Sequence, residues 1–402
     1  MSLLPVEEAL QRVLDGITPL GSETVDLIAA GGRVLADDVI ARLTQPPFNA
    51  SAMDGYAVRG DDVKSAPAHF TVIGEANAGG PFNGVVGPGE AVRIFTGGSL
   101  PEGADTVVIQ ENTERSGNAL TVLEAASRGA NIRSMGSDFR ADETLLKAGR
   151  LIDASAITLA AAGGHAHLAV RRKPRIAILA TGDELVPPGN QPGVGQIISS
   201  NPYGLAALIE SFGGKAHLLG IAADNMPALA NALADADDAD VLVTIGGASV
   251  GDRDLVKPAL EARGMALDFW KVAIRPGKPM LFGRLNAQQR VLGLPGNPLS
   301  CLITARIFLV PLLYALLGRT DDPLAEQTAV LAGEIPENGP RQHYMRALLT
   351  PVPGELPRAA PLSSFDSAHI TALATANALI VRPPCAKSAS IGEVVRVLPI
   401  DF

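Results

Sequence analysis

The stretch RIAILATGDEL, residues 175–185, is an apolar run followed by a polar loop that contains a glycine. The same organisation recurs in VLVTIGGASVGDRD (241–254) and RVLGLPGNPLS (290–300). Further strand patterns and helical patterns alternate with these three segments. Such alternation predicts a mainly parallel sheet with helices on both faces. The strands are expected at 215–222 and as a pair within 268–285, and the helices at 203–212, 226–236, 255–263 and 298–317.

The three loops are predicted to form one ligand site, because ligands of open parallel sheets bind outside the carboxyl ends of the strands. Glycines in GGASVG allow backbone N–H groups to approach an anion, and Ser249 adds a hydroxyl. Asn297 and Pro298 favour a helix start whose N–H groups face an anion. The loops therefore predict a site for a phosphate-bearing ligand.

Charged residues in and near these loops indicate what the site binds. Asp183 and Glu184 would repel a phosphate unless a divalent cation such as Mg²⁺ lies between them. Further carboxylates could join this cation site, and cationic side chains could neutralise the ligand. The carboxylates are Asp224, Asp252 and Asp254, and the cations are Lys271, Arg275 and Lys278.

Each feature also has a purely structural interpretation. Asp224 could cap the helix that follows it, and the Gly-Gly pair could be a tight turn. The PGKP segment around Lys278 could be a plain hairpin turn. PPFNASAMDGYAV (46–58), which holds Asn49, Ser51 and Asp54, could be a structural loop. We favour a site because the three loops are expected on one sheet edge.

The rest of the chain predicts further parts. An amphipathic helix is expected at 3–15, with helical patterning through Ala36. Short β-prone runs between glycines and prolines predict a small β domain over 46–138. An Ala-rich helix is expected at 153–163. After Asp321, short strands and turns predict a small β domain or barrel.

Composition narrows the functional classes. The chain has a net charge of −9 and no basic block, which argues against nucleic-acid binding. Cys301 and Cys385 have no ligand-like spacing, and a reduced cytoplasmic setting is the simplest expectation. The most apolar stretch, 299–318, contains Arg306 and Pro311, and we expect a buried helix rather than a membrane span.

The motifs together resemble the molybdopterin molybdenumtransferase family, which is known as MoeA in bacteria and as the E domain of gephyrin. The matching stretches occur in the family's order and cover nearly the whole chain. They are PPFNASAMDGYAV, FTGGSLPEGADTVV, ILATGDELV with GQIISSN, GGASVGDRD, FWKVAIRPGKP and GLPGNPLSC, followed more loosely by HYMRA and SSFDSAHITALATANALIV.

The resemblance implies a multidomain α/β and β fold: an elongated N-terminal domain, an inserted β domain, a central α/β molybdopterin-binding domain and a C-terminal β-barrel-like domain. The implied bounds are 1–45 with 140–172, 46–139, 173–320 and 321–402. It also implies an elongated homodimer in which Asp54 and Thr96 of one subunit complete the other subunit's site.

The implied reaction inserts molybdate into adenylylated molybdopterin, with Mg²⁺-dependent cleavage of the phosphoanhydride and release of molybdenum cofactor and AMP. Glu184, Asp224 and Asp254 would organise Mg²⁺ or the pterin phosphate, and with Lys271 and Asp54 would take part in catalysis. The implied substrate-binding residues, with Ser300, Arg346 and Ser367 for molybdate, are Thr96, Thr181, Gly182, Asp183, Gly246, Gly247, Ser249, Gly251, Arg275, Lys278, Pro295, Gly296, Asn297, Ser300, Arg346 and Ser367.

Three alternatives stay open. The chain could be a non-catalytic scaffold, as in the gephyrin branch, although it lacks that branch's linker and fused enzyme domain. It could be a nucleotide-processing enzyme that shares only the α/β domain. It could also prefer tungstate, which matches molybdate in charge. Expected partners are molybdopterin adenylyltransferase and apo-molybdoenzymes or their chaperones.

Overall fold

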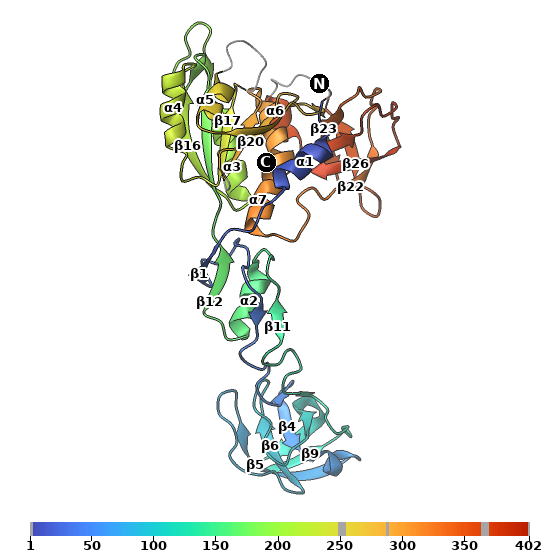
Figure 1. Ribbon diagram of the computed structural model, residues 1–402. Coiled ribbons are helices and arrows are strands. Elements are labelled where there is room, and N and C mark those ends of the chain that lie inside the picture. Colours follow the sequence, from blue (N-terminus) through green and yellow to red (C-terminus); the bar gives the residue numbers. More distant parts are fainter. Residues whose placement is uncertain (1–2, 248–254, 287–288, 363–369, 401–402) are drawn as a thin grey trace.

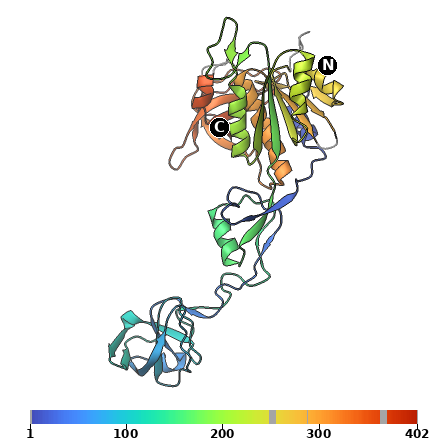
Figure 2. The same cartoon turned by 90° about the vertical axis from the view of Figure 1, so that its left-hand side faces the viewer.

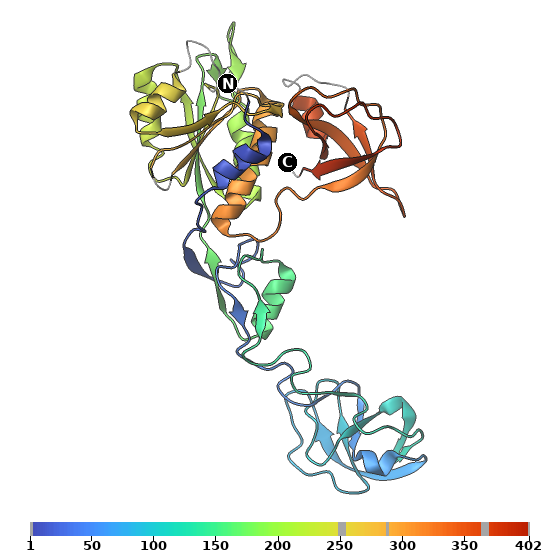
Figure 3. The same cartoon turned by 45° about the vertical axis from the view of Figure 1, so that its right-hand side comes forward.

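The computed structural model describes residues 3–247, 255–286, 289–362 and 370–400. The molecule is elongated, with an α/β sheet and a β barrel at one end and a separate β sheet at the other (Figure 1). Two chain segments run between these ends and form a small middle region (Figure 3). The predicted fold class, multidomain α/β and β, is confirmed.

The α/β part contains one six-stranded sheet in the order β16-β13-β17-β21-β20-β18. The first four strands are parallel, and the last two are the antiparallel pair predicted within 268–285. The strands are β13 (Arg175–Thr181), β16 (Lys215–Ala222), β17 (Val241–Ile245), β18 (Ala266–Trp270), β20 (Leu281–Arg284) and β21 (Arg290–Leu294).

Helices cover both faces of this sheet, as the alternating pattern predicted (Figure 2). Strand β13 is buried on both sides: Ile176 and Ile178 belong to one apolar cluster, and Ala177 and Leu179 to the other. The first cluster includes side chains of α1 (Val6–Leu14), α3 (Asn201–Ser211), α6 (Pro298–Thr304) and α7 (Val310–Leu317), and the second those of α4 (Met226–Ala234) and α5 (Val256–Ala262).

One helical run in the described part of the chain, Pro298–Leu317, is long and apolar enough to cross a membrane. Its most apolar window is 89% buried inside the protein. A π-helical turn at Ala305–Leu309 joins α6 to α7. The run therefore forms the core helix that the sequence predicted.

The expected helical continuation to Ala36 is wrong. After α1 the chain forms β1 (Ser22–Asp26), which pairs antiparallel with β12 (His167–Arg171). Pro19 and the glycines at 16 and 21 interrupt the helix, and pairing with a strand about 145 residues later decides the conformation of the segment. The middle region also contains β2 (Val39–Ile40), β11 (Thr144–Leu146) and α2 (Ala154–Ala162).

The sheet at the far end has the order β7-β4-β6-β5-β9-β8. Tyr56 and Val58 of β4 pack against Phe70 and Leu120, and Ala57 packs on the opposite face. We call this part the inserted sheet. Its strands are β4 (Gly55–Val58), β5 (Ala68–Ala76), β6 (Glu90–Ile94), β7 (Thr106–Ile109), β8 (Thr113–Ser116) and β9 (Ala119–Val122).

The C-terminal strands close into a barrel, because β23 pairs with both β24 and β25 and the order continues through β22 and β26. A short strand, β19 (Ile274–Arg275), leaves the α/β part and pairs with β23. The barrel strands are β22 (Gln327–Leu331), β23 (Gln342–Thr350), β24 (Arg358–Pro361), β25 (Ala378–Arg382) and β26 (Val394–Pro399). The domain bounds given above remain predictions.

Candidate functional site

The three loops of the central sheet contact one another at the carboxyl edge, where they were expected. A Cβ atom placed on Gly246 would lie 2.8 Å from the Thr181 carbonyl oxygen, and one placed on Gly296 would lie 3.8 Å from the Gly246 Cα. Gly246 also has a φ of +87°, so a side chain there would be both strained and obstructed. Asn201 fixes the third loop by donating its side-chain N–H to the Gly296 carbonyl at 2.6 Å.

A second feature is a group of acidic side chains, which we call the carboxylate corner: Asp183 and Glu184 lie in the first loop, and Asp224 follows β16. The Asp183 carboxylate accepts the backbone N–H of Asp224 at 3.0 Å. Partial burial raises the pKa of the Asp224 carboxyl, and the negative charges of Asp183 and Glu184 raise it further. This crowding of negative charge favours a cation nearby, although the three carboxylates alone are not grouped closely enough to hold one.

Two of the three expected Mg²⁺ ligands, Glu184 and Asp224, lie within the described residues. Asp254, the third expected Mg²⁺ ligand, lies outside the described residues, as do Asp252, Ser249, Gly251 and Ser367. Within the described ranges no three His, Cys, Asp or Glu side chains are grouped closely enough to hold a metal ion. Asp224 is not the cap of α4, because the neighbouring Asn225 accepts the Ala228 N–H at 3.0 Å.

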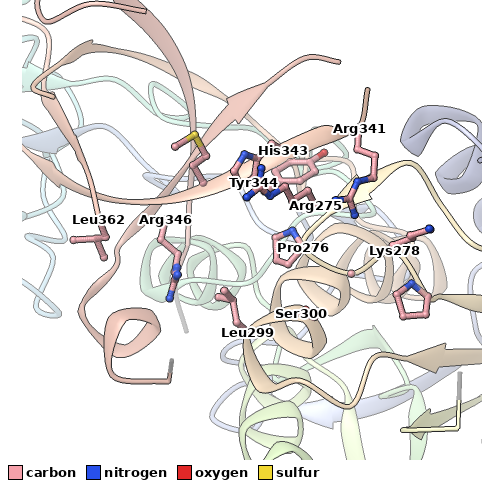
Figure 4. A pocket seen from close by; sticks show the side chains of 13 residues that line it. Arg275, Pro276, Lys278, Leu299, Ser300, Arg341, His343, Tyr344, Arg346 and Leu362 are labelled. Atoms are coloured by element: carbon pink, nitrogen blue, oxygen red, sulfur yellow. The ribbon is translucent and has the colours of Figure 1, made fainter. Parts of the chain in front are cut away.

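The third feature is a cavity of about 280 Å³ between the α/β part and the barrel, which we call the cationic pocket. Figure 4 shows that its side chains come from both parts. Arg275 is the last residue of β19, Lys278 lies between β19 and β20, Ser300 lies on α6, and Arg346 lies on β23. Ser300 and Arg346 are both buried. Four of the predicted ligand residues therefore meet in one cavity.

Arg341 and His343 also line this pocket, and the sequence analysis missed both. Burial lowers the pKa of the Arg341 guanidinium, and the positive charge of Arg275 lowers it further. The His343 pKa falls to about 4, first because of burial and then because of Arg275, Arg341, Arg382 and Arg346. Such concentrated positive charge favours an anionic ligand. The run RQHYMR (341–346), which is rich in polar residues, could have indicated a site. The run alone does not reveal which strand of the barrel faces the sheet.

The segment RPGKP (275–279) lines the pocket. Gly277 has a φ of +104°, and a Cβ atom there would collide with the Thr304 hydroxyl oxygen. Glycine is therefore required by both backbone conformation and packing. Asn297 occupies the N-cap position of α6 and Pro298 the first helical position, although the Asn297 side chain makes no capping hydrogen bond.

Lys271 is not among the residues that line the cationic pocket. It follows β18 with a φ of +91°, a conformation that is rare for a residue with a side chain. Its N–H donates to the Met280 carbonyl at 2.9 Å, and its ammonium lies 5.4 Å from the centre of the Trp270 ring. Strain of this kind is concentrated at functional sites in proteins.

Asp54 and Thr96 lie together in the inserted sheet. The Asp54 carboxylate accepts the Thr96 N–H at 2.7 Å and the Thr96 hydroxyl at 2.8 Å. These two hydrogen bonds, the backbone one first, lower the pKa of the Asp54 carboxyl. The inserted sheet is at the opposite end of the molecule from the α/β part and the barrel, which line the cationic pocket (Figures 1 and 3). One chain therefore does not bring this pair to the loops.

Three family models match the chain in sequence order. The "MoeA N-terminal region (domain I and II)" matches residues 4–164, the "Probable molybdopterin binding domain" matches 177–315, and the "MoeA C-terminal region (domain IV)" matches 328–400. A molybdopterin molybdenumtransferase of Nostoc is 37% identical over 95% of this chain and 89% of its own.

The chain belongs to the MoeA family of molybdopterin molybdenumtransferases. A Bacillus subtilis member is 34% identical over 99% of this chain and 94% of its own length. A solved MoeA structure from Pyrococcus horikoshii has a TM-score of 0.85 at 31% identity and covers both chains completely. This MoeA-family fold places the cationic pocket between the regions matched by the second and third family models.

Proposed function

We propose that this chain inserts molybdenum from molybdate into adenylylated molybdopterin, with Mg²⁺-dependent cleavage of the phosphoanhydride and release of AMP. The observation that carries the proposal is the cationic pocket, where Arg275, Lys278, Arg341 and Arg346 line one cavity. A tetrahedral dianion fits this charge and the Ser300 hydroxyl. Curated relatives over nearly the whole chain are named molybdopterin molybdenumtransferase, which supports the same substrate.

The cationic pocket and the carboxylate corner have different roles in the proposed reaction. In this proposal the cationic pocket binds the oxyanion through guanidinium and ammonium groups, and Ser300 and Ser367 donate hydroxyl hydrogen bonds. The carboxylate corner, with Asp254, holds Mg²⁺, which when bound neutralises charge on the phosphoanhydride. Thr181 and the loop glycines bring backbone N–H groups to the phosphates.

We further propose a homodimer, because Asp54 and Thr96 are hydrogen-bonded into one unit that lies far from its own chain's loops. A twofold-related copy could present this unit to the site. In this proposal, molybdopterin adenylyltransferase supplies the substrate, and apo-molybdoenzymes or their chaperones receive the product. The reaction takes place in the cytoplasm.

The deciding experiment incubates the purified chain with adenylylated molybdopterin and Mg²⁺, with and without molybdate, and follows AMP by chromatography. We expect AMP release that depends on both ions, and its loss in Glu184→Gln with the fold preserved. AMP release with tungstate but not molybdate would reassign the oxyanion. Binding of the substrate without AMP release under any condition would favour a scaffold.

A further inference from the structure

The hydrogen-bonded pair of Asp54 and Thr96 lies where three strands of the inserted sheet end. Asp54 directly precedes β4, and Thr96 follows β6 by two residues. Strands β4 and β6 are antiparallel neighbours (Figure 1), and their ladder ends at the pairing of Gly55 with Ile94. Gln110 follows β7, which pairs with β4 on its other side. Because the strand ladders stop short of Asp54 and Thr96, other contacts must orient the two side chains.

Arg93 on β6 supplies these contacts. Its guanidinium donates one N–H to the Gly55 carbonyl at 3.2 Å and another to the side-chain oxygen of Gln110 at 2.6 Å. The backbone N–H of Gln110 in turn donates to the Asp54 carbonyl at 3.1 Å. Arg93 therefore fixes the backbone directly after Asp54 and, through Gln110, the backbone of Asp54 itself.

Two aromatic rings hold the guanidinium of Arg93 in place. Its central carbon lies 5.1 Å from the centre of the Tyr56 ring and 4.8 Å from the centre of the Phe95 ring. Both distances are within the range of a cation–π contact. Phe95 directly precedes Thr96 in the chain, so the second contact connects the cation to the other member of the pair as well.

We propose that Arg93 is a positioning residue that holds the Asp54–Thr96 pair in the orientation in which it completes the substrate site. This inference rests on the proposed function and adds a residue to it. A pair that reaches the site from another subunit has no support there until it docks, so its geometry must be set within its own sheet. The two hydrogen bonds from Thr96 lower the pKa of the Asp54 carboxyl most, and the positive charge of Arg93 lowers it further. Arg93 therefore also helps to keep the Asp54 carboxylate ionised.

The chemistry of this position favours a guanidinium over an ammonium. A guanidinium is planar, and it offers separate N–H groups to two acceptors while its face contacts aromatic rings. Lysine at position 93 would keep the charge but not this double hydrogen bond. Glutamine would lose the charge. The two substitutions therefore separate the electrostatic effect of Arg93 from its geometric effect.

The first test measures AMP release across pH for Arg93→Gln, Arg93→Lys and the control Arg115→Gln. Arg115 is an exposed arginine on β8, three strands away from β6, and it donates to the Gly117 carbonyl at 2.8 Å. Arg93→Gln should slow AMP release at least about tenfold at pH 7, which corresponds to loss of one charge-assisted hydrogen bond. The acidic limb of its pH profile should move to higher pH, because Asp54 ionises less readily without the cation.

Arg93→Lys should release AMP more slowly than the wild type but keep the acidic limb where the wild type has it. Arg115→Gln should match the wild type in both respects. Thermal melting of each variant verifies folding. A folded Arg93→Gln protein with wild-type AMP release would overturn the proposal. A slower Arg93→Gln protein whose acidic limb stays in place would also overturn it, because a purely structural role would give that result.

A second measurement needs no substrate. In protein labelled with ¹³C-aspartate, the NMR signal that is missing from Asp54→Asn reports the pKa of the Asp54 carboxyl. Arg93→Gln should raise this pKa, and Arg115→Gln should leave it unchanged. Another charged group at these strand ends, the Glu111 carboxylate, accepts a side-chain N–H of Gln110 at 3.4 Å and is retained in all of these proteins. An unchanged Asp54 pKa in Arg93→Gln would contradict the assignment.

The two measurements distinguish this proposal from the proposed function. If the wild type releases AMP with molybdate, but Arg93→Gln neither slows the release nor raises the Asp54 pKa, the transferase function stands and the positioning role fails. If Arg93→Gln raises the Asp54 pKa but the wild type releases no AMP, the action of Arg93 on Asp54 stands and the transferase function fails.

Discussion

Arg275 and His343 are directly paired in the short parallel ladder between β19 and β23, where the α/β part joins the barrel. This pairing brings a cation from the sheet segment and an imidazole from the barrel to the same cavity. The cationic pocket therefore exists only when the two parts are docked. Anion binding is expected to strengthen this junction, because the ligand bridges both walls.

Arg346→Ala should weaken molybdate binding by about tenfold to a hundredfold, which corresponds to loss of one charge-assisted hydrogen bond. The matched control is Arg358→Ala, an exposed arginine on the neighbouring strand β24 that does not line the pocket. Isothermal titration with molybdate measures both. Equal effects in the two variants would show that net charge alone attracts the anion.

Asp224→Asn should be at least as stable as the wild type at pH 7. The raised pKa of Asp224 means that the folded chain favours the protonated form of this carboxyl. The stabilisation that comes from this protonation is lost as pH rises through the folded pKa. The backbone N–H that binds Asp183 is unchanged by the substitution. Excess Mg²⁺ should raise the melting temperature of the wild type only. Equal Mg²⁺ stabilisation of the variant would remove Asp224 from the cation site.

His343 should make stability depend on pH between its ordinary pKa of 6.5 and its folded pKa of about 4. The folded chain favours the neutral ring, so the stabilisation is present above 6.5 and is lost as pH falls toward 4, by up to about 1.4 kcal/mol per pH unit. His343→Gln removes the imidazole that takes up a proton when the chain unfolds in this pH range. Urea titrations at pH 7 and 4.5 should show a smaller loss in the variant, and equal losses would contradict the assignment.

Lys271→Gly should be more stable than Lys271→Ala by about 1 kcal/mol, because only glycine adopts a φ of +91° without strain. Both variants lose the ammonium, so they form a matched pair for its chemical role. We expect AMP release to be lost in both. Denaturant titrations compare the stabilities, and an alanine variant as stable as the glycine variant would contradict the strain argument.

Mixing Asp54→Ala subunits with Glu184→Gln subunits should restore about a quarter of wild-type AMP release. Random reassortment gives half heterodimers, and each would contain one intact site of two if the inserted sheet serves the partner's loops. Asp54→Ala mixed with Thr96→Val is the control, because both defects lie in the inserted sheet and leave no site intact. No recovery in the first mixture would place each site within one chain.

The parallel sheet and its loops could be predicted from sequence because their signals are local. Buried strands such as RIAILA are continuously apolar, the helices between them are periodic, and topology then requires their carboxyl-end loops to converge. Contacts among Thr181, Gly246 and Gly296 show that convergence. The apolar run at 298–317 was likewise assigned to the core from its length and charges.

Non-local contacts decided the remainder. The segment Ser22–Asp26 became a strand because its partner lies far along the chain, which no local pattern shows. Arg341 and His343 reached the cationic pocket because β19 pairs with β23 and turns one wall of the barrel toward the sheet. The sequence by itself thus determined which groups carry the chemistry, because residue type and local periodicity can be read directly from the order of amino acids. Tertiary structure alone decided which of them share one cavity, because that depends on how separately formed parts dock.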